Sequence, residues 1–304
     1  IEMALPYLYL KGISSGDFSD VMPVLLGKDV VGFSADTVLR LRKQWKEELD
    51  QWHKRRLESK NYVYIWADGV YLQARMDDDK QCILVIIGAT PEGKKELVGF
   101  IDGYRESGQS WGELLLDLKA RGLNIPPKLA IGDGALGFWS ALEKVWPQTS
   151  QQRCWFHKSG NVLNKLPKSL QSKATADLHD IWMAETKEDA NVAFDLFVEK
   201  YDKKYPQATA CLAKDRSELL AFYDFPAEHW KHIRTTNPIE STFATVKHRT
   251  KRSKGCLGRE TAFVMVFKLI KNAEKTWRKL DGKNQLPKII SGVKFSDGLE
   301  VNDK

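Results

Sequence analysis

The chain has 304 residues, of which 42% are hydrophobic and 10 are tryptophan, so it can bury a sizeable core and is too large for one small domain. Its net charge of +7 fits an anionic partner such as nucleic acid, although such an excess is also common for solubility alone. Four scattered cysteines without a CxxC pair argue against a disulfide framework or a zinc ribbon and favour a reducing, intracellular setting. The longest apolar run, Cys82 to Ile87, is too short to span a membrane.

Residues 1–58 are predicted to be helical. One apolar stripe repeats at steps of three and four, as on one face of a helix: Val38, Leu41, Trp45, Leu49 and Trp52. Basic residues occupy the other faces: Arg40, Arg42, Lys43, Lys46, Lys54, Arg55 and Arg56. A short helix, a turn and a basic helix resemble a helix-turn-helix DNA-binding module. The alternative is a plain helical subdomain with a solvated charged face.

Residues 59–155 predict a mixed α/β sheet. Three β-prone segments are joined by short polar turns and should form an antiparallel meander: 61–75, 81–89 and 96–104. Ser110 and Glu113 form a capping box that should open a helix. A short buried strand, 129–132, and a helix over 136–145 should follow.

Two carboxylates lie within this predicted sheet. Asp133 follows a buried strand at the mouth of the sheet, where ligand chemistry is usual, although an Asp-Gly turn without chemistry is the alternative. Asp68 interrupts the apolar segment YIWADGVYL. It is either part of an Asp-Gly hairpin turn or a residue of a continuous strand that points into a site beside Asp133.

Residues 156–230 are predicted to be an all-helical insertion between two parts of the sheet domain, since they contain no strand signal. Thr186 and Asp189 should cap one of its helices. At its entrance, Cys154 and His157 have half of a zinc-site spacing, but the other ligands that a closed zinc site needs are not visible nearby. A buried cysteine beside a hydrogen-bonded histidine is the alternative.

A further helix should start at Asn237 and Pro238. Glu240 is then either a capping-box glutamate that reaches back to Asn237 or a metal ligand, and both interpretations predict the same helix start. From Ser241 to Arg259 the chain has no acidic residue, and its six basic residues are suited to phosphate contacts: Lys247, Arg249, Lys251, Arg252, Lys254 and Arg259.

Asp68, Asp133 and Glu240 together make a D…D…E set. Carboxylate oxygens are the ligands that Mg²⁺ prefers. Two ions roughly 3.5–4 Å apart can stabilise the attacking and leaving oxygens of a phosphoryl displacement. The three carboxylates and the basic run after them therefore predict metal-dependent chemistry on a nucleic acid.

Four motifs in combination resemble the IS256 family of bacterial insertion-sequence transposases, which is related to eukaryotic Mutator elements: WADGVYLQAR, IGDGALGFW, RCWFHK and TTNPIESTFATVKHRT. The resemblance covers almost the whole chain. It implies a ribonuclease-H-like mixed α/β sheet that is interrupted by the helical insertion, with Asp68, Asp133 and Glu240 as the catalytic and metal-binding DDE triad. It also implies that Cys154 and His157 match the family's C/D-x-x-H motif.

The resemblance implies five regions. They are a helix-turn-helix-like region at 1–58, the two catalytic parts at 59–155 and 231–280, the insertion at 156–230 and an irregular tail at 281–304. Family members usually carry further N-terminal DNA-binding sequence. Because the chain begins with Ile1 rather than Met, we expect it to be truncated.

The predicted function is a DDE transposase of the bacterial cytoplasm, associated with the nucleoid, that uses two Mg²⁺ or Mn²⁺ ions and no small-molecule cofactor. Its partner would be double-stranded DNA, as both element ends and target. The active complex would be a homodimer, and no membrane partner is expected. One alternative is a ribonuclease-H-like nuclease without strand transfer. Another is a catalytically inactive or domesticated DNA-binding derivative that acts as a repressor.

Overall fold

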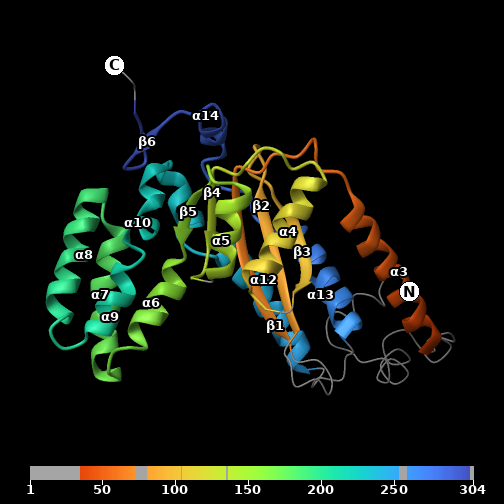
Figure 1. Ribbon diagram of the computed structural model, residues 1–304, viewed down its shortest axis with the longest axis horizontal. Coiled ribbons are helices and arrows are strands. Elements are labelled where there is room, and N and C mark those ends of the chain that lie inside the picture. Colours follow the sequence, from red (N-terminus) through yellow and green to blue (C-terminus); the bar gives the residue numbers. More distant parts are fainter. Residues whose placement is uncertain (1–34, 73–80, 104, 135, 253–258, 302–304) are drawn as a thin grey trace, which may run out of the picture.

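A computed structural model describes residues 35–72, 81–103, 105–134, 136–252 and 259–301 (Figure 1). At its centre is a five-stranded mixed sheet with the strand order β3-β2-β1-β4-β5. The strands are β1 (Tyr64–Leu72), β2 (Gln81–Ala89), β3 (Lys95–Gly103), β4 (Leu129–Gly132) and β5 (Ser150–Arg153). The predicted antiparallel meander of the first three strands is confirmed, and β4 pairs in parallel with both β1 and β5.

The continuous-strand interpretation of the Asp68 segment is confirmed, and the hairpin alternative is wrong. β1 pairs with β2 along its whole length, with Asp68 opposite Val85. Because side chains alternate along a strand, Asp68 lies on the same face of the sheet as Trp66 and Val70, which belong to one core cluster. The face that Asp68 occupies is therefore the face that this cluster covers.

Helices cover both faces of the sheet (Figure 1). On one face, α4 (Gly108–Ala120) and α5 (Leu136–Val145) pack over a second core cluster that includes Ile65 and Leu84. On the other face, α12 (Asn237–Arg252) packs against β1 and α13 (Arg259–Glu274) against β3. The predicted capping box at Ser110 is wrong by three residues, because Ser107 is the N-cap of α4 and accepts a hydrogen bond from the Ser110 N–H at 3.1 Å.

Replacing Leu142 of α5 with alanine is expected to lower the free energy of unfolding by about 2–5 kcal/mol, because its fully buried side chain would leave a cavity beneath the sheet. Urea unfolding followed by circular dichroism measures the loss. Leu116 of α4 is 58% exposed, so Leu116→Ala serves as a control that should change stability by only about 0.5 kcal/mol. Equal effects of the two substitutions would contradict the packing described above.

The predicted apolar stripe near the N-terminus lies on α3 (Ala35–Lys54), which packs against α13. Trp45 and Leu49 are buried, and two basic residues that flank this stripe make contacts with α13. Arg42 donates a hydrogen bond to Thr261, and Lys46 forms an ion pair with Glu260. The basic helix of the predicted helix-turn-helix region is α3, whereas the short helices and turns predicted before it lie in residues 1–34, outside the described residues.

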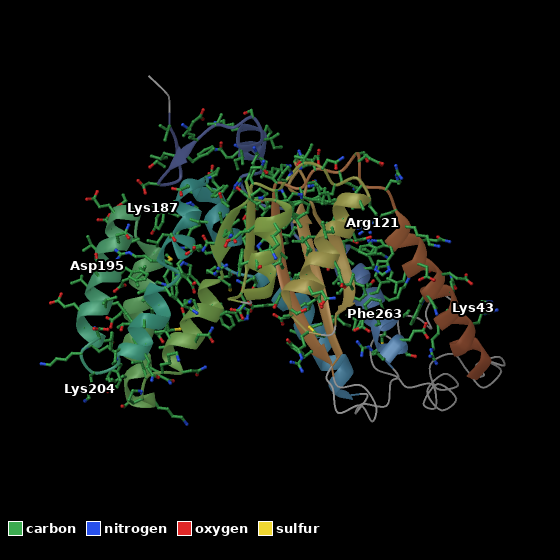
Figure 2. All side chains as sticks on the ribbon, in the orientation of Figure 1. Lys43, Arg121, Lys187, Asp195, Lys204 and Phe263 are labelled. Carbon is green, nitrogen blue, oxygen red and sulfur yellow. The ribbon has the colours of Figure 1, made fainter. Side chains whose placement is uncertain are left out.

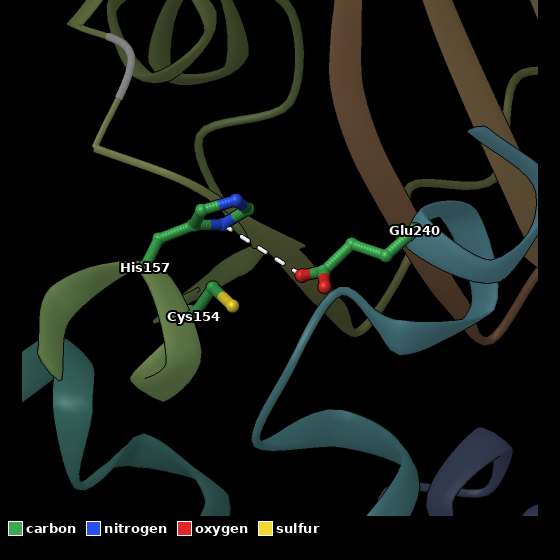
Figure 3. A group of neighbouring side chains, drawn as sticks. All are labelled: Cys154, His157 and Glu240. Carbon is green, nitrogen blue, oxygen red and sulfur yellow. Dashed lines mark ion pairs between the residues drawn. The ribbon is translucent and has the colours of Figure 1, made fainter. Parts of the chain in front are cut away.

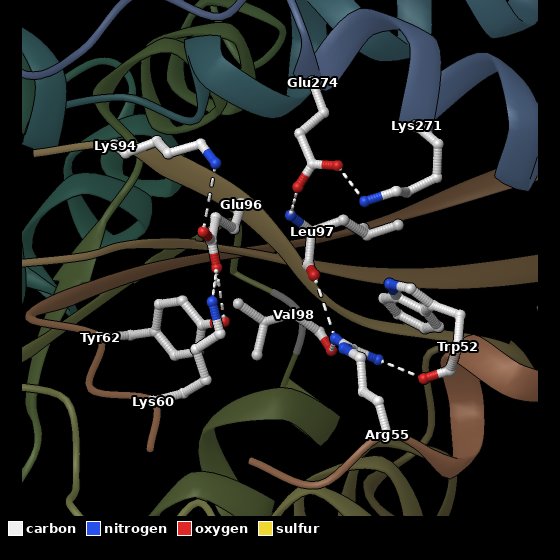
Figure 4. A network of polar contacts seen from close by, with 10 residues as sticks. All are labelled: Trp52, Arg55, Lys60, Tyr62, Lys94, Glu96, Leu97, Val98, Lys271 and Glu274. Atoms are coloured by element: carbon white, nitrogen blue, oxygen red, sulfur yellow. Dashed lines mark hydrogen bonds and ion pairs between the residues drawn. The ribbon is translucent and has the colours of Figure 1, made fainter. Parts of the chain in front are cut away.

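Arg55, predicted as part of a basic DNA-binding face, instead anchors the end of α3 to a bulge in β3 (Figure 4). The pairing of β2 and β3 shifts register at Val98, and a bulge leaves backbone groups of the ladder without strand partners. Arg55 donates to the carbonyls of Leu97 and Val98 at 3.1 and 2.8 Å. The Leu97 N–H also has a side-chain partner at the bulge, because it donates to Glu274 Oε1 at 2.8 Å.

The chain between β5 and α12 contains helices and no strand. These elements are α6 (Trp155–Leu163), α7 (Lys168–Met183), α8 (Lys187–Tyr201), α9 (Pro206–Ala213), α10 (Arg216–Leu219), η1 (Ala221–Asp224), η2 (Ala227–His229) and α11 (Trp230–Ile233). Helices α6 to α9 stand beside the sheet rather than over it (Figure 1). The predicted cap of α8 is confirmed, because Thr186 Oγ1 accepts from the Asp189 N–H at 3.1 Å. Charged side chains of α8, such as those of Lys187 and Asp195, lie on the outside of this group of helices (Figure 2).

The segment from Asp281 onward, expected to be irregular, has short regular elements: η3 (Lys283–Gln285), α14 (Leu286–Ile290), β6 (Phe295–Ser296) and β7 (Leu299–Glu300). Its apolar residues Leu286 and Ile289 are buried. Gly298 has a φ of +79° and lies so close to Ala227 that a side chain would not fit there. Across the described residues, each helix is too short or too polar to cross a membrane.

Candidate functional site

Three parallel strands lie side by side, and β4 and β5 end where β1 carries Asp68, so the two predicted aspartates lie on adjacent strands. In the register of the sheet, Ala67 of β1 pairs with Gly132 of β4, and Gly132 pairs with Arg153 of β5. The next residue on each strand is therefore Asp68, Asp133 or Cys154. The Cys154 N–H donates to the Gly132 carbonyl at 2.8 Å and extends this pairing by one residue. Carboxyl ends of parallel strands are where ligands bind in open α/β sheets.

Asp68 and Asp133 lie on the same face of the sheet. Alternation along β4 puts Asp133 with Leu129 and Ile131, and these two belong to the same cluster as Trp66 on β1. The Trp139 indole N–H donates to the Asp133 carbonyl at 2.8 Å, which fixes the backbone where the strand leads into α5. The sheet thus presents the two carboxylates toward the face that α12 covers.

The environment of Asp68 is that of a buried carboxylate among other acids. Burial raises the pKa of Asp68 to about 7, and the charges of Glu106 and Asp133 act in the same direction. The charge of His157 and a hydrogen bond from the Gly69 N–H to Asp68 Oδ1 at 2.8 Å oppose that rise. A cation between Asp68 and Asp133 would relieve this cost, so the donor chemistry fits a divalent metal ion.

Glu106 is a third acid of the cluster, and sequence reasoning missed it. Its carboxylate lies over Gly69, where a Cβ would overlap it, and so it approaches from the side of the sheet opposite to Asp68. Burial raises the pKa of Glu106, and the charge of Asp133 raises it further. Glu106 directly precedes Ser107, the N-cap of α4. The sequence around Glu106 has no motif that would have indicated a role in the site.

Three other predicted residues form a second group (Figure 3). Cys154 and His157 come from the start of α6, and Glu240 comes from the first turn of α12. One ligand atom from each of these three lies within 4.8 Å of the other two, the one such group among the described residues. His157 Nδ1 is 3.9 Å from Glu240 Oε1.

Thr236 joins this group at its centre. Its hydroxyl is 2.7 Å from Glu240 Oε1, 3.3 Å from Cys154 Sγ and 3.5 Å from His157 Nδ1, and the residue is fully buried. Glu240 therefore accepts a hydrogen bond from Thr236, whereas the capping-box alternative has it reach back to Asn237. The Asn237 N–H instead approaches Thr235 Oγ1 at 3.4 Å. Sequence reasoning did not single out Thr236, although it precedes Glu240 by four residues.

The backbone before α12 is anchored to the sheet, and this anchoring places Glu240. The Trp66 indole N–H donates to the His232 carbonyl at 3.0 Å, and the Trp155 N–H donates to the Arg234 carbonyl at 2.9 Å. The Thr236 N–H donates to Cys154 Sγ at 3.3 Å. These hydrogen bonds hold the segment before α12 against the middle of β1 and against the residues that follow β5.

His157 connects the two groups electrostatically. Its hydrogen bond with Cys154 raises the pKa of His157 to about 9, although burial lowers it, and the charges of Asp133 and Asp68 contribute to the rise. The His157 ring is thus near the Glu240 carboxylate and also within the influence of the charges of the two aspartates. Asp68, Asp133 and Glu240 do not form a group of ligand atoms within 4.8 Å of one another in the described structure, so the triad stays a prediction.

The predicted phosphate-binding run lies mostly outside the described side chains. The backbone of α12 extends to Arg252, but nothing is described of the side chains of Lys247, Arg249, Lys251 and Arg252, and Lys254 is outside the described residues altogether. Arg259 begins α13 and forms an ion pair with Asp102 at 2.8 Å, so this one member of the run is held against the end of β3.

Comparison with known proteins finds similarity to transposases. A family-wide sequence profile described as "Transposase, Mutator family" matches residues 1–280. The transposase for insertion sequence element IST2 of Acidithiobacillus ferrooxidans is 50% identical over 93% of this chain and 96% of its own length. The transposase for IS6120 of Mycolicibacterium smegmatis is 47% identical over 97% and 90% of the two chains. That of IS256 in transposon Tn4001 of Staphylococcus aureus is 29% identical over 80% and 62%.

Proposed function

Because the chain belongs to the Mutator family of transposases, we propose that it is a DDE transposase, which cuts DNA at the ends of an insertion sequence and joins the freed 3′ end to a target. One observation carries the proposal: Asp68 within β1 and Asp133 just after β4 lie on adjacent parallel strands, on the face that α12 covers, and α12 bears Glu240. Carboxylates on one face of a sheet and on the helix that covers it could together hold the metal ions of a phosphoryl displacement on DNA.

Asp68, Asp133 and Glu240 would hold two Mg²⁺ or Mn²⁺ ions in this mechanism. Such ions supply charge stabilisation for the attacking and leaving oxygens of the phosphate. The raised pKa of Asp68 and the acids around it support a cation-binding role. Thr236 and His157 would orient the Glu240 carboxylate, since both contact its oxygen. No small-molecule cofactor is needed for these steps.

A ribonuclease-H-like arrangement is part of the proposal. The order β3-β2-β1-β4-β5, with β1 to β3 antiparallel and β4 and β5 parallel to β1, supports it. Residues 156–230 would be an insertion, because the chain leaves the sheet after β5, forms only helices and returns to β1 through α12.

The proposed partner is double-stranded DNA, as both element end and target. The net charge of +7 and the acid-free run from Lys247 to Arg259 favour binding to its phosphates. Two element ends have to be brought together before they are joined, so we propose a homodimer in the active complex. The expected setting is the bacterial cytoplasm, at the nucleoid.

The test incubates the protein with a duplex that carries the element end, a supercoiled target plasmid and Mg²⁺. We expect a free 3′ end and its covalent joining to the plasmid, both abolished by a chelator and restored by added Mg²⁺ or Mn²⁺. Gel analysis of end-labelled strands measures both products. Cutting without joining would identify a nuclease, and DNA binding without metal-dependent turnover would identify an inactive DNA-binding derivative.

A further inference from the structure

A cavity of about 600 Å³ opens beside His157, between α6, α7 and the segment from Lys231 to Asn237. Its volume is in the range of sites that bind small organic groups. His157 lines the cavity and also faces Glu240, so the cavity begins at the edge of the candidate catalytic site. Neither the transposase chemistry proposed above nor the packing of the core accounts for it.

Aromatic rings form part of the cavity wall. Phe156 directly precedes His157 and is 62% exposed, so its ring is accessible at the cavity. On the α7 side, Trp182 is only partly buried, and its ring lies 5.1 Å from that of the buried Trp155. Accessible aromatic rings that line one cavity are the kind of surface on which a nucleobase stacks.

Polar groups in the cavity are basic or neutral. Besides His157, the charged lining residues are Lys231 and Arg234, and none of the lining residues is acidic. Arg234 is held in place by hydrogen bonds to the carbonyls of Trp182 and Trp230. Lys231 pairs with Asp281, but both side chains are largely exposed, so an anion could replace that contact at little cost.

A second cavity of about 500 Å³, between α7 and α8, shows the contrast. It is lined by Asp177, Asp180 and Glu199 with Lys200 as its one basic residue, so its charge disfavours a phosphate. The cavity beside His157 combines a basic lining with exposed aromatic surface, and side-chain amides of Asn161, Asn164 and Asn237 are available to base edges.

We propose that the cavity beside His157 receives an unpaired nucleotide of the DNA strand that enters the catalytic site, with its base stacked on Phe156 and its phosphate facing Arg234 and Lys231. Base stacking tolerates any sequence, so this site would select single-stranded character rather than a particular base. The inference rests on the proposed function, because it needs DNA at the neighbouring carboxylates. The inference goes beyond that function, because it requires one nucleotide to be unpaired from the complementary strand, which the carboxylate site alone does not.

The test compares binding, without metal and therefore without turnover, of two labelled duplexes by fluorescence anisotropy. One is fully paired across the cleaved bond, and the other has three unpaired nucleotides beyond it. We expect the wild-type protein to prefer the second duplex, Phe156→Ala to lose that preference roughly 5- to 100-fold, and Phe156→Tyr to keep it. Leu196→Ala on α8 is the control, because this exposed residue lies outside the cavity.

Two outcomes would overturn the inference: a preference that survives in Phe156→Ala, or a loss of affinity that is equal for both duplexes. Cutting and joining by the wild-type protein are measured separately. If they occur while Phe156→Ala keeps the preference, the inference fails and the proposed function stands.

Discussion

Replacing Asp133 with asparagine is expected to abolish both DNA cleavage and strand joining while it leaves folding and DNA binding largely intact. The substitution removes one negative charge and keeps the size of the side chain. Loss of a metal-holding carboxylate forfeits several kcal/mol of transition-state stabilisation, which corresponds to about three orders of magnitude or more in rate. End-labelled substrates in Mg²⁺ measure the rate, and anisotropy measures DNA binding.

The structure explains why Asp133 is the sharper choice for this test. The Trp139 indole holds the backbone carbonyl of Asp133, and asparagine leaves that contact in place. Asp68 is more deeply enclosed within β1, so a change there would combine chemical and packing effects. Asp180→Asn on the exposed surface of α7 is the matched control and should leave the rate unchanged. Joining activity retained by Asp133→Asn would refute the catalytic assignment.

The central strands could be predicted from the sequence because their signals are local. The segments that form β1 to β3 are rich in apolar and β-branched residues and are separated by short turns, which leaves an antiparallel meander as the simple solution. In contrast, β5 was not predicted, because its sequence SQQR is polar. It is a strand because β4 offers a parallel edge and Gln152 is fixed by Leu219 and Phe222, which are distant in the sequence.

The candidate site could be predicted only in part for the same physical reason. Asp68 and Asp133 have local signals, one as an acid in an apolar strand and the other as an acid at a strand end. Glu106 and Thr236 acquire their places through tertiary contacts, with Gly69 in one case and Cys154 in the other. For Arg259 the local signal indicates a different role from its tertiary contact. The basic run around it favours DNA binding, whereas its guanidinium group forms an ion pair with Asp102.

Removing the Thr236 hydroxyl by Thr236→Val is expected to lower the rates of cleavage and joining about 10- to 100-fold and to raise the Mg²⁺ concentration required for activity. Valine keeps the shape of threonine but cannot donate to Glu240 Oε1, which lies 2.7 Å from the hydroxyl. Cys154 and His157 lose the same partner. The Glu240 carboxylate would then be oriented by His157 alone among the residues of this group.

The conservative variant separates positioning from general stability. Thr236→Ser keeps the hydroxyl, so it should retain activity within a few fold and the metal dependence of the wild-type protein, whereas a role in packing alone would not depend on the hydroxyl. Thr276→Val, at an exposed threonine that bonds only its own helix end, controls for loss of a hydroxyl elsewhere. If Thr236→Val lowers the melting temperature but leaves the Mg²⁺ dependence unchanged, Thr236 supports the fold and does not position Glu240.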